Sequence, residues 1–212
     1  MIEQDYFMRM ISEFGRVLSR ILFLKEQHDF PRAVLEIQTS GKALLGIDPT
    51  IISSMSAAQL RRLLGSDPAL AVPRAYILGL LLAEEADLRA LMGEETDTLR
   101  AKSLEILLDA WLEGEQPLGQ DHVSRIDALI ERLSGCSLPA ELLEKVAAFQ
   151  ERNGRYDRAE NAVYDILASK PEFAPEALQF YRRLLLKSDA ELDAGNLPRD
   201  EVLEGMAGVK TR

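Results

Sequence analysis

Apolar side chains recur at helical spacing along nearly the whole chain, and this periodicity constrains the fold more than any other feature of the sequence. From Tyr6 through Val17 to Leu24 they return every three or four residues, which places them along one side of a long amphipathic helix. The same spacing returns between Tyr76 and Leu91. We therefore predict an all-α fold with no sheet.

Proline, glycine and polar residues interrupt this periodicity where helices commonly begin or end. Pro31 lies just inside one predicted helix, and Gly93 lies where another ends. Residues 116–119, with the sequence Gln-Pro-Leu-Gly, form the clearest connector. We expect a single helical-repeat domain over residues 1–212. Its predicted parts are a first helix pair (1–46), an insertion with a short helix (47–73), a second helix pair (74–115), a linking helix (120–135), a third helix pair (139–173), a capping helix (174–195) and a frayed tail (196–212).

The third pair carries the most specific local pattern. Gly154 is followed two residues later by Tyr156, then by the small Ala159, and Pro171 closes the second helix. This segment, from Ala140 to Phe173, resembles a tetratricopeptide repeat, whose period is about 34 residues. The resemblance implies antiparallel helix pairs stacked as an irregular tetratricopeptide-like α-α superhelix. Stacking is needed because one pair alone cannot bury its apolar face.

The resemblance also implies where a partner would bind. In this family the first helix of each pair lines a concave surface, and here that helix presents Glu141, Glu144, Ala148 and Glu151. Three acids on one helix face predict a protein or peptide partner of basic character, although an ordinary solvated face explains them equally well. Separately, the N-terminal segment from Gln4 to Ile11 resembles the opening of an uncharacterised bacterial family with no known activity.

The charge of the chain narrows the class of partner. A formal net charge of -10 and a sequence pI of about 4.8 argue against nucleic acid, whose phosphates attract clustered Lys and Arg. They also argue against docking on an anionic membrane surface. Cys136 is the only cysteine, so no disulfide forms within the chain, and acids occupy the N-terminus where a secretory signal carries basic residues. We expect a cytoplasmic protein.

No group of residues in the sequence has the spacing of a catalytic or cofactor site. His28 and His122 are the only histidines, and neither forms a paired motif with Cys136 or with an acid. A nucleophilic cysteine needs a base or a helix N-terminus beside it, and the sequence places neither at Cys136. We therefore predict no enzyme activity, no metal and no cofactor.

The resulting prediction is a non-catalytic interaction or scaffolding module that binds a partner through a concave helical surface. Two alternatives stay open. One is a helical enzyme or small-molecule sensor whose site is built from residues distant in sequence. The other is a homodimeric assembly module, formed through the apolar stripe of the first helix.

Overall fold

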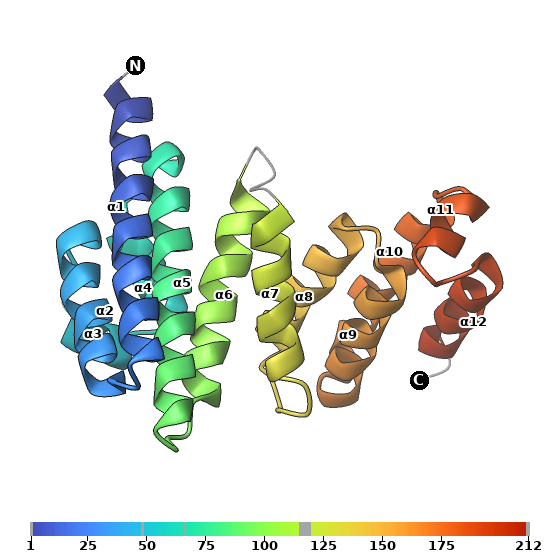
Figure 1. Ribbon diagram of the computed structural model, residues 1–212. Coiled ribbons are helices and arrows are strands. Elements are labelled where there is room, and N and C mark those ends of the chain that lie inside the picture. The colour runs from blue at the N-terminus through green and yellow to red at the C-terminus, as the bar shows by residue number, and fades with distance from the viewer. Residues whose placement is uncertain (1, 48, 66, 115–119, 211–212) are drawn as a thin grey trace. The chain divides into compact units, whose positions relative to one another are not determined.

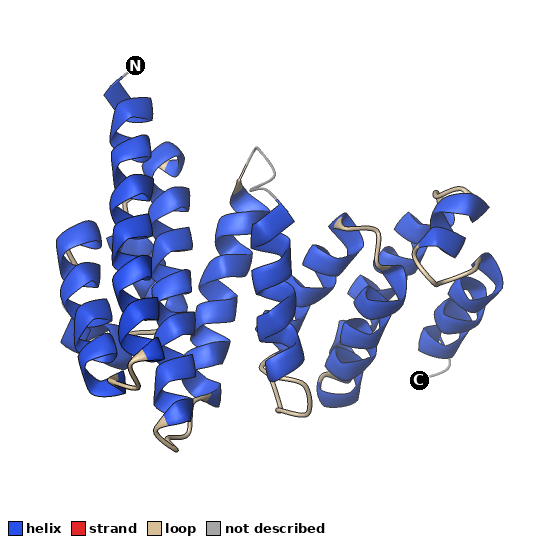
Figure 2. Ribbon diagram, viewed as in Figure 1, coloured by secondary structure: helices blue, strands red, loops and turns tan. Residues whose placement is uncertain are grey.

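A computed structural model describes residues 2–47, 49–65, 67–114 and 120–210 of the chain. Every regular element in these residues is a helix, which confirms the predicted all-α class (Figures 1 and 2). The chain divides into two compact units, Met1–Cys136 and Ser137–Arg212, and each is described by itself. The single domain over residues 1–212 stays a prediction. The predicted connector at 116–119 lies outside the described residues.

The N-terminal unit is organised around one central helix. Its elements are α1 (Ile2–Glu26), α2 (Phe30–Leu45), α3 (Pro49–Ser54), α4 (Ala57–Leu63), α5 (Pro68–Leu91), α6 (Asp97–Glu113) and α7 (Gln120–Arg132). Helix α5 packs against α1, α2 and α6, and α6 packs in turn against α4 and α7 (Figure 1). Among the described helices, none combines the length and the apolarity that crossing a bilayer requires.

The predicted turn within the first helix pair and the predicted turn within the second helix pair are both confirmed. Helices α1 and α2 are joined at residues 27–29, where the Asp29 side chain accepts a hydrogen bond from the Arg32 amide. Helices α5 and α6 are joined by residues 92–96, with Gly93 at a φ of 81° that favours glycine. Both pairs therefore form where the local turn chemistry predicts them.

Helices α5 and α6 approach each other most closely at Gly79. A Cβ atom at this position would lie 2.5 Å from Cγ of Leu107 and 3.4 Å from the Ser103 carbonyl oxygen. The buried Ser103 hydroxyl donates a 2.7 Å hydrogen bond to the Gly79 carbonyl across the same contact. Glycine at this crossing therefore allows the two backbones to pack closely.

The short helix predicted within the insertion at 47–73 is confirmed as α4, but the rest of the segment differs from the prediction. It contains two short helices, α3 and α4, and α5 already begins at Pro68 and continues through Pro73. Because Ala71 and Val72 are buried, the packing of this segment outweighs the hydrogen bond that Pro73 cannot make.

Arg74 then ties three helices of this unit together. Its guanidinium donates to the carbonyl oxygens of Leu45, at 2.7 Å, and Leu64, at 2.9 Å. These oxygens lie at the C-terminal ends of α2 and α4, where a cation complements the helix dipoles.

The C-terminal unit begins with the third predicted pair. Its elements are α8 (Ala140–Arg152), α9 (Tyr156–Ser169), the 3-10 turn η1 (Pro171–Phe173), α10 (Ala174–Leu185), α11 (Asp189–Ala194) and α12 (Arg199–Lys210). Gly154 lies in the turn between α8 and α9 with a φ of 70°. Ala159 is completely buried, and Tyr156 is buried beside the turn. The α8–α9 hairpin is therefore confirmed.

The end of the chain differs from its prediction. The expected capping helix at 174–195 is two helices, because Ser188 and Glu191 form a capping box that begins α11. The tail from 196 was expected to fray, yet 199–210 form α12. Its Val202 and Val209, with Leu197 before it, are buried. Burial of these three side chains explains why the segment stays helical.

Helix α12 packs on α10 through a second close glycine contact. A Cβ atom at Gly205 would lie 2.5 Å from the hydroxyl oxygen of Tyr181. That hydroxyl donates a 2.8 Å hydrogen bond to Oε1 of Glu160 on α9. Burial raises the pKa of the Glu160 carboxyl, and the Tyr181 hydrogen bond opposes this effect.

Candidate functional site

The predicted partner-binding face lies on α8, and two of its three acids already have cationic partners. Oε1 of Glu144 lies 3.7 Å from Nζ of Lys170. Arg183 donates from Nε and Nη2 to the two carboxylate oxygens of Glu151, at 2.8 and 2.7 Å. Glu141 is exposed and Ala148 is half-buried. The face therefore presents less negative charge than the sequence suggested.

The pair between Glu151 and Arg183 joins α8 to α10 within the C-terminal unit. Two parallel hydrogen bonds fix the guanidinium against the carboxylate and make this stronger than a single contact. The pKa of Arg183 is raised, chiefly by its hydrogen bond to Glu151. Periodicity gives no signal for such a pair, because its members are 32 residues apart.

A second candidate, which the sequence did not reveal, lies in the N-terminal unit between α5, α6 and α7. We call it the α5–α7 groove. Its volume is about 170 Å³, and it is open to solvent on one side. Its apolar floor consists of Leu80, Ala83, Leu107 and Leu129, and its charged rim consists of Glu84, Asp87, Arg125 and Arg132.

The carboxylates of the groove are more recessed than its arginines. The side chains of Glu84 and Asp87 are 15% and 21% exposed, whereas those of Arg125 and Arg132 are 42% and 48% exposed. Arg125 and Arg132 are seven residues apart, so both extend from one face of α7. The two carboxylates are therefore recessed from the surface, whereas the two guanidinium groups extend toward solvent.

Each recessed carboxylate has cations from two neighbouring helices. Glu84 lies 3.9 Å from Nζ of Lys25 on α1 and 3.8 Å from Nη1 of Arg125 on α7. These two distances exceed those of well-formed hydrogen bonds, so both cations keep donors for other partners.

The second carboxylate is shared in the same way, by α6 and α7. Asp87 lies 3.6 Å from Nη2 of Arg100, and it also accepts from Nη1 of Arg132. Arg100 in turn lies 3.8 Å from Asp97. With Lys25 and Arg125 included, this cluster holds four cations and three carboxylates, which is a local positive excess in a chain of net charge -10.

Comparison with protein-family models matches residues 1–212 to DUF6483, a family of unknown function. The chain belongs to this family. The predicted resemblance to an uncharacterised family is thereby confirmed, and it extends over the whole chain rather than its first helices. No curated protein and no solved structure matches this DUF6483 member.

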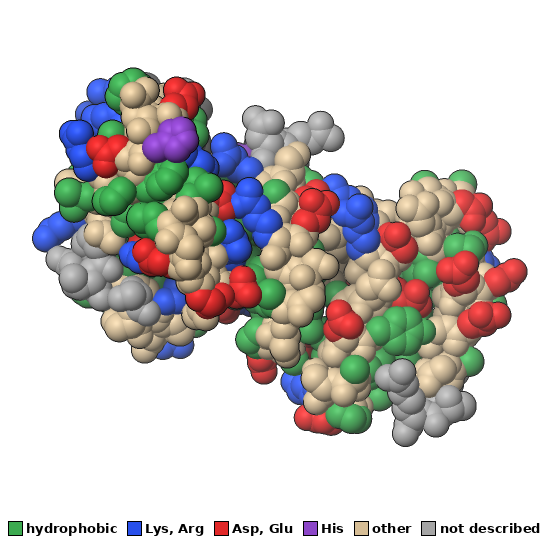
Figure 3. Space-filling view, turned by 60° about the horizontal axis from the view of Figure 1, so that its bottom comes forward, with side chains coloured by type: hydrophobic (Ala, Val, Ile, Leu, Met, Phe, Trp, Pro, Cys, Tyr) green, Lys and Arg blue, Asp and Glu red, His purple; other side chains and the backbone are tan. Residues whose placement is uncertain are grey.

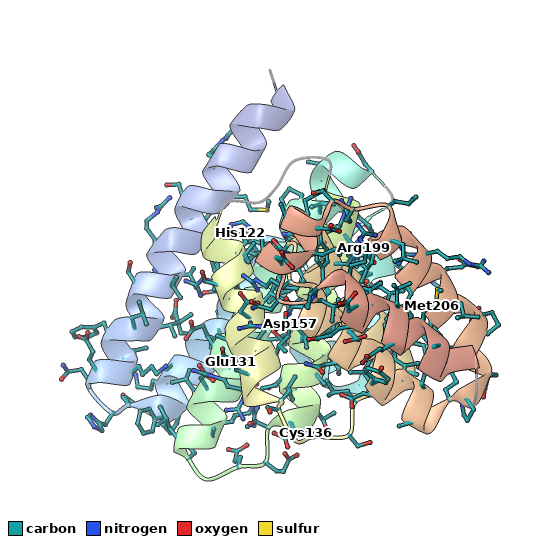
Figure 4. The ribbon with its side chains drawn as sticks, turned by 90° about the vertical axis from the view of Figure 1, so that its right-hand side faces the viewer. His122, Glu131, Cys136, Asp157, Arg199 and Met206 are labelled. Carbon is teal, nitrogen blue, oxygen red and sulfur yellow. The ribbon has the colours of Figure 1, made fainter. Side chains whose placement is uncertain are left out.

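His122 and Cys136, two of the residues considered for catalysis in this DUF6483 protein, lie at separate places (Figure 4). The ring of His122 stacks on Tyr76, with centroids 3.8 Å apart. The Cys136 thiol donates to Oδ2 of Asp97 at 3.2 Å, and this hydrogen bond is the main reason that its pKa is raised. A raised pKa leaves less thiolate, which lowers the nucleophilicity of Cys136.

The first histidine occupies a turn rather than a cluster. His28 has a φ of 58° and lies beside Phe30, with ring centroids 5.8 Å apart. Within the described part of the chain, no group of three or more His, Cys, Asp or Glu residues is placed to hold a metal ion. The predicted lack of enzyme activity stays a prediction.

Figure 3 shows where charge gathers on one face of the molecule. Basic and acidic side chains are interspersed over the N-terminal unit, and acidic side chains predominate toward the C-terminal end. The acids of α11 and α12 are Asp189, Glu191, Asp193, Asp200, Glu201 and Glu204.

Proposed function

We propose that this DUF6483 protein is a non-catalytic interaction module, and that its α5–α7 groove binds a short acidic segment of a partner protein. One observation carries the proposal: exposed arginines surround recessed carboxylates above an apolar floor. The recessed Glu84 and Asp87 hold Arg125 and Arg132 at the rim. A partner carboxylate can pair with the exposed side of either guanidinium, and an apolar side chain can cover Leu80 and Leu129.

The size of the groove favours a weak and rapid interaction. A volume of about 170 Å³ accommodates one or two side chains. Stable protein interfaces bury about 1,200–2,000 Å² in total, which a short segment in this groove does not reach. Exposed rim charges act mainly on the rate of association. The proposed complex should therefore be transient and sensitive to salt.

The proposed partner segment is negatively charged, whereas the acids on the α8 face suggested a positively charged partner. A basic partner there would compete with Arg183, which donates to both carboxylate oxygens of Glu151. The α5–α7 groove has spare cationic donors instead. Binding of a basic partner to α8 is the alternative, and the test below distinguishes it from binding of an acidic segment in the α5–α7 groove.

The tetratricopeptide-like architecture is also part of this proposal. It is supported by the positive φ of Gly154, the buried Tyr156 and Ala159, and the start of η1 at Pro171. Gln150, which stands where the repeat usually has an aromatic residue, is buried and accepts a 3.3 Å hydrogen bond from Arg155. The cytoplasm remains the proposed compartment, since the single Cys136 can form no disulfide within the chain.

The test compares two synthetic probes of opposite charge. Fluorescence anisotropy is measured with a labelled decapeptide of alternating Glu and Leu and with its Lys and Leu counterpart. We expect the acidic peptide to bind more tightly. Its affinity should fall at high salt, because the Debye length is about 10 Å at 0.1 M and shortens as salt rises.

A double variant then locates the binding site. Arg125→Gln with Arg132→Gln should weaken binding of the acidic peptide about tenfold, which corresponds to about 1.4 kcal/mol. Arg62→Gln with Arg182→Gln removes the same charge from exposed positions outside the groove and is the matched control. Equal losses in both double variants, or preferential binding of the basic peptide, would refute the proposed groove.

A further inference from the structure

A separate cavity of about 200 Å³ lies in the N-terminal unit, among α2, α3, α5 and α6. We call it the α2–α5 cavity. Its wall is predominantly aliphatic, and one end is polar. The aliphatic residues are Ile37, Ile52, Leu78, Leu81, Leu82 and Leu99. Such a wall favours a hydrocarbon group, because the gain comes from removing apolar surface from water.

Gly41 of α2 helps to create this space. It lies inside the helix, where alanine would be more favourable than glycine. A Cβ atom at Gly41 would make only an ordinary contact, at 3.9 Å, with Cδ1 of Leu81. Close packing therefore does not require glycine at this position, and a larger side chain would extend into the cavity.

The polar end consists of Gln38, Glu85 and Arg89. Oε1 of Glu85 accepts from Nε and Nη2 of Arg89, at 2.9 and 2.7 Å, and from Nε2 of Gln38 at 3.5 Å. All three bonds meet one oxygen, so Oε2 of Glu85 retains its capacity to accept. The Glu85 side chain is only 12% exposed. This acceptor therefore lies beside the apolar wall.

Arg89 offers donors next to that acceptor. Besides its two bonds to Glu85, it donates from Nη1 to Oε2 of Glu94 at 2.7 Å. Glu94 is 46% exposed and is not among the residues that line the cavity. Among the described contacts, three of the five guanidinium N–H groups are engaged, and two remain for a ligand.

The charge at this end selects the head group. Glu85 and Arg89 carry opposite charges, so a charged head group would meet one like charge here and would also lose its hydration on entering an apolar site. A neutral group that both donates and accepts can satisfy the two sides at once. We propose that the α2–α5 cavity binds a neutral short-chain amphiphile, with an aliphatic tail against the leucines and a hydroxyl or carboxamide head between Glu85 and Arg89.

The volume limits the length of the ligand. An engineered apolar cavity of about 150 Å³ accommodates benzene. The α2–α5 cavity is somewhat larger, so it suits about six to eight non-hydrogen atoms on the same scale. 1-Hexanol and hexanamide meet this limit and carry the proposed head groups. Hexanoate and hexylammonium have nearly the same size and differ in charge. This inference is independent of the α5–α7 groove.

The experiment is a titration of the full chain, labelled with ¹³C at leucine methyl groups, with each of these four compounds. We expect 1-hexanol and hexanamide to shift the methyl signals of Leu78, Leu81 and Leu82. They should bind at least about tenfold more tightly than hexanoate and hexylammonium, which corresponds to the loss of one good contact to the head group. Equal affinity for a charged compound, or no selective shift of these methyl signals, overturns the proposal.

Substitution at Gly41 tests the location. Gly41→Leu should fill the cavity and weaken binding of 1-hexanol at least about tenfold, since its side chain occupies the place of the ligand tail. Gly41→Ala is the matched control, because it makes the same backbone change and leaves most of the space. If Gly41→Leu does not fold, nuclear Overhauser contacts between 1-hexanol and Leu81 in the wild-type chain decide instead. Binding that Gly41→Leu leaves unchanged, or missing contacts to Leu81, refutes the site.

Discussion

Gly79→Ala adds one methyl group where α5 and α6 pack most closely. The new Cβ atom would lie 2.5 Å from Cγ and 2.6 Å from Cδ2 of Leu107, well inside van der Waals contact. Leu107 is completely buried, so it cannot turn toward solvent. Overpacking of this kind typically costs about 1–3 kcal/mol, while exchanging glycine for alanine within a helix stabilises by about 1 kcal/mol. We expect a net loss of up to about 2 kcal/mol.

Gly15→Ala is the matched control for this prediction. Gly15 lies inside α1, is exposed, and would have no atom within 4 Å of an added Cβ. This variant should gain about 0.5–1 kcal/mol from helix propensity alone. The difference in unfolding free energy between the two variants therefore gives the cost of overpacking at the α5–α6 contact.

The assay is urea unfolding followed by tryptophan fluorescence. Trp111 on α6 is the only tryptophan, so its emission reports the N-terminal unit and not the unfolding of residues 137–212. Gly79→Ala should lower the urea midpoint, and Gly15→Ala should raise it, with an unchanged slope. If Gly79→Ala stabilises the unit as much as Gly15→Ala does, the close approach at Gly79 is wrong.

Three further predictions concern the C-terminal unit. Ala159→Leu should destabilise it by about 1–3 kcal/mol, because Ala159 is completely buried; unchanged thermal stability would count against the tetratricopeptide-like crossing. Burial raises the pKa of Glu160, so its contribution to stability is present below pH 4.5 and is lost as pH rises through the raised folded pKa. Glu160→Gln should therefore gain stability relative to wild type as pH rises above 4.5, and parallel stability curves would contradict this. Arg183→Gln should cost at most about 1 kcal/mol, since Arg183 is 54% exposed, and a larger loss in urea unfolding would show that its pair with Glu151 is more than a surface salt bridge.

The helices and turns that could be predicted depend on short stretches of sequence. The turn at Gly154 and the buried face of α9 follow from residues within one helix pair, so periodicity and glycine placement suffice. The frayed tail was wrong because Val202 and Val209 become buried only when α12 packs on α10. Local pattern carries little information about such tertiary stabilisation.

The interaction surfaces were harder to predict for the same reason. Arg132 meets Asp87 across 45 residues, and Gln38 meets Glu85 across 47. Neither pair has a sequence signal, since each joins helices whose neighbours are set by the fold. The α8 acids were visible as a helix face, yet the Arg183 that pairs with Glu151 lies two helices further on.

The most direct test of the proposed function is to map the acidic Glu and Leu decapeptide onto the protein by amide chemical-shift perturbation. Our account predicts that the largest shifts lie along residues 80–87 of α5 and 125–132 of α7, and that they diminish in the Arg125→Gln and Arg132→Gln double variant. Largest shifts on α8, between Glu141 and Glu151, or shifts spread evenly over both units, would contradict it.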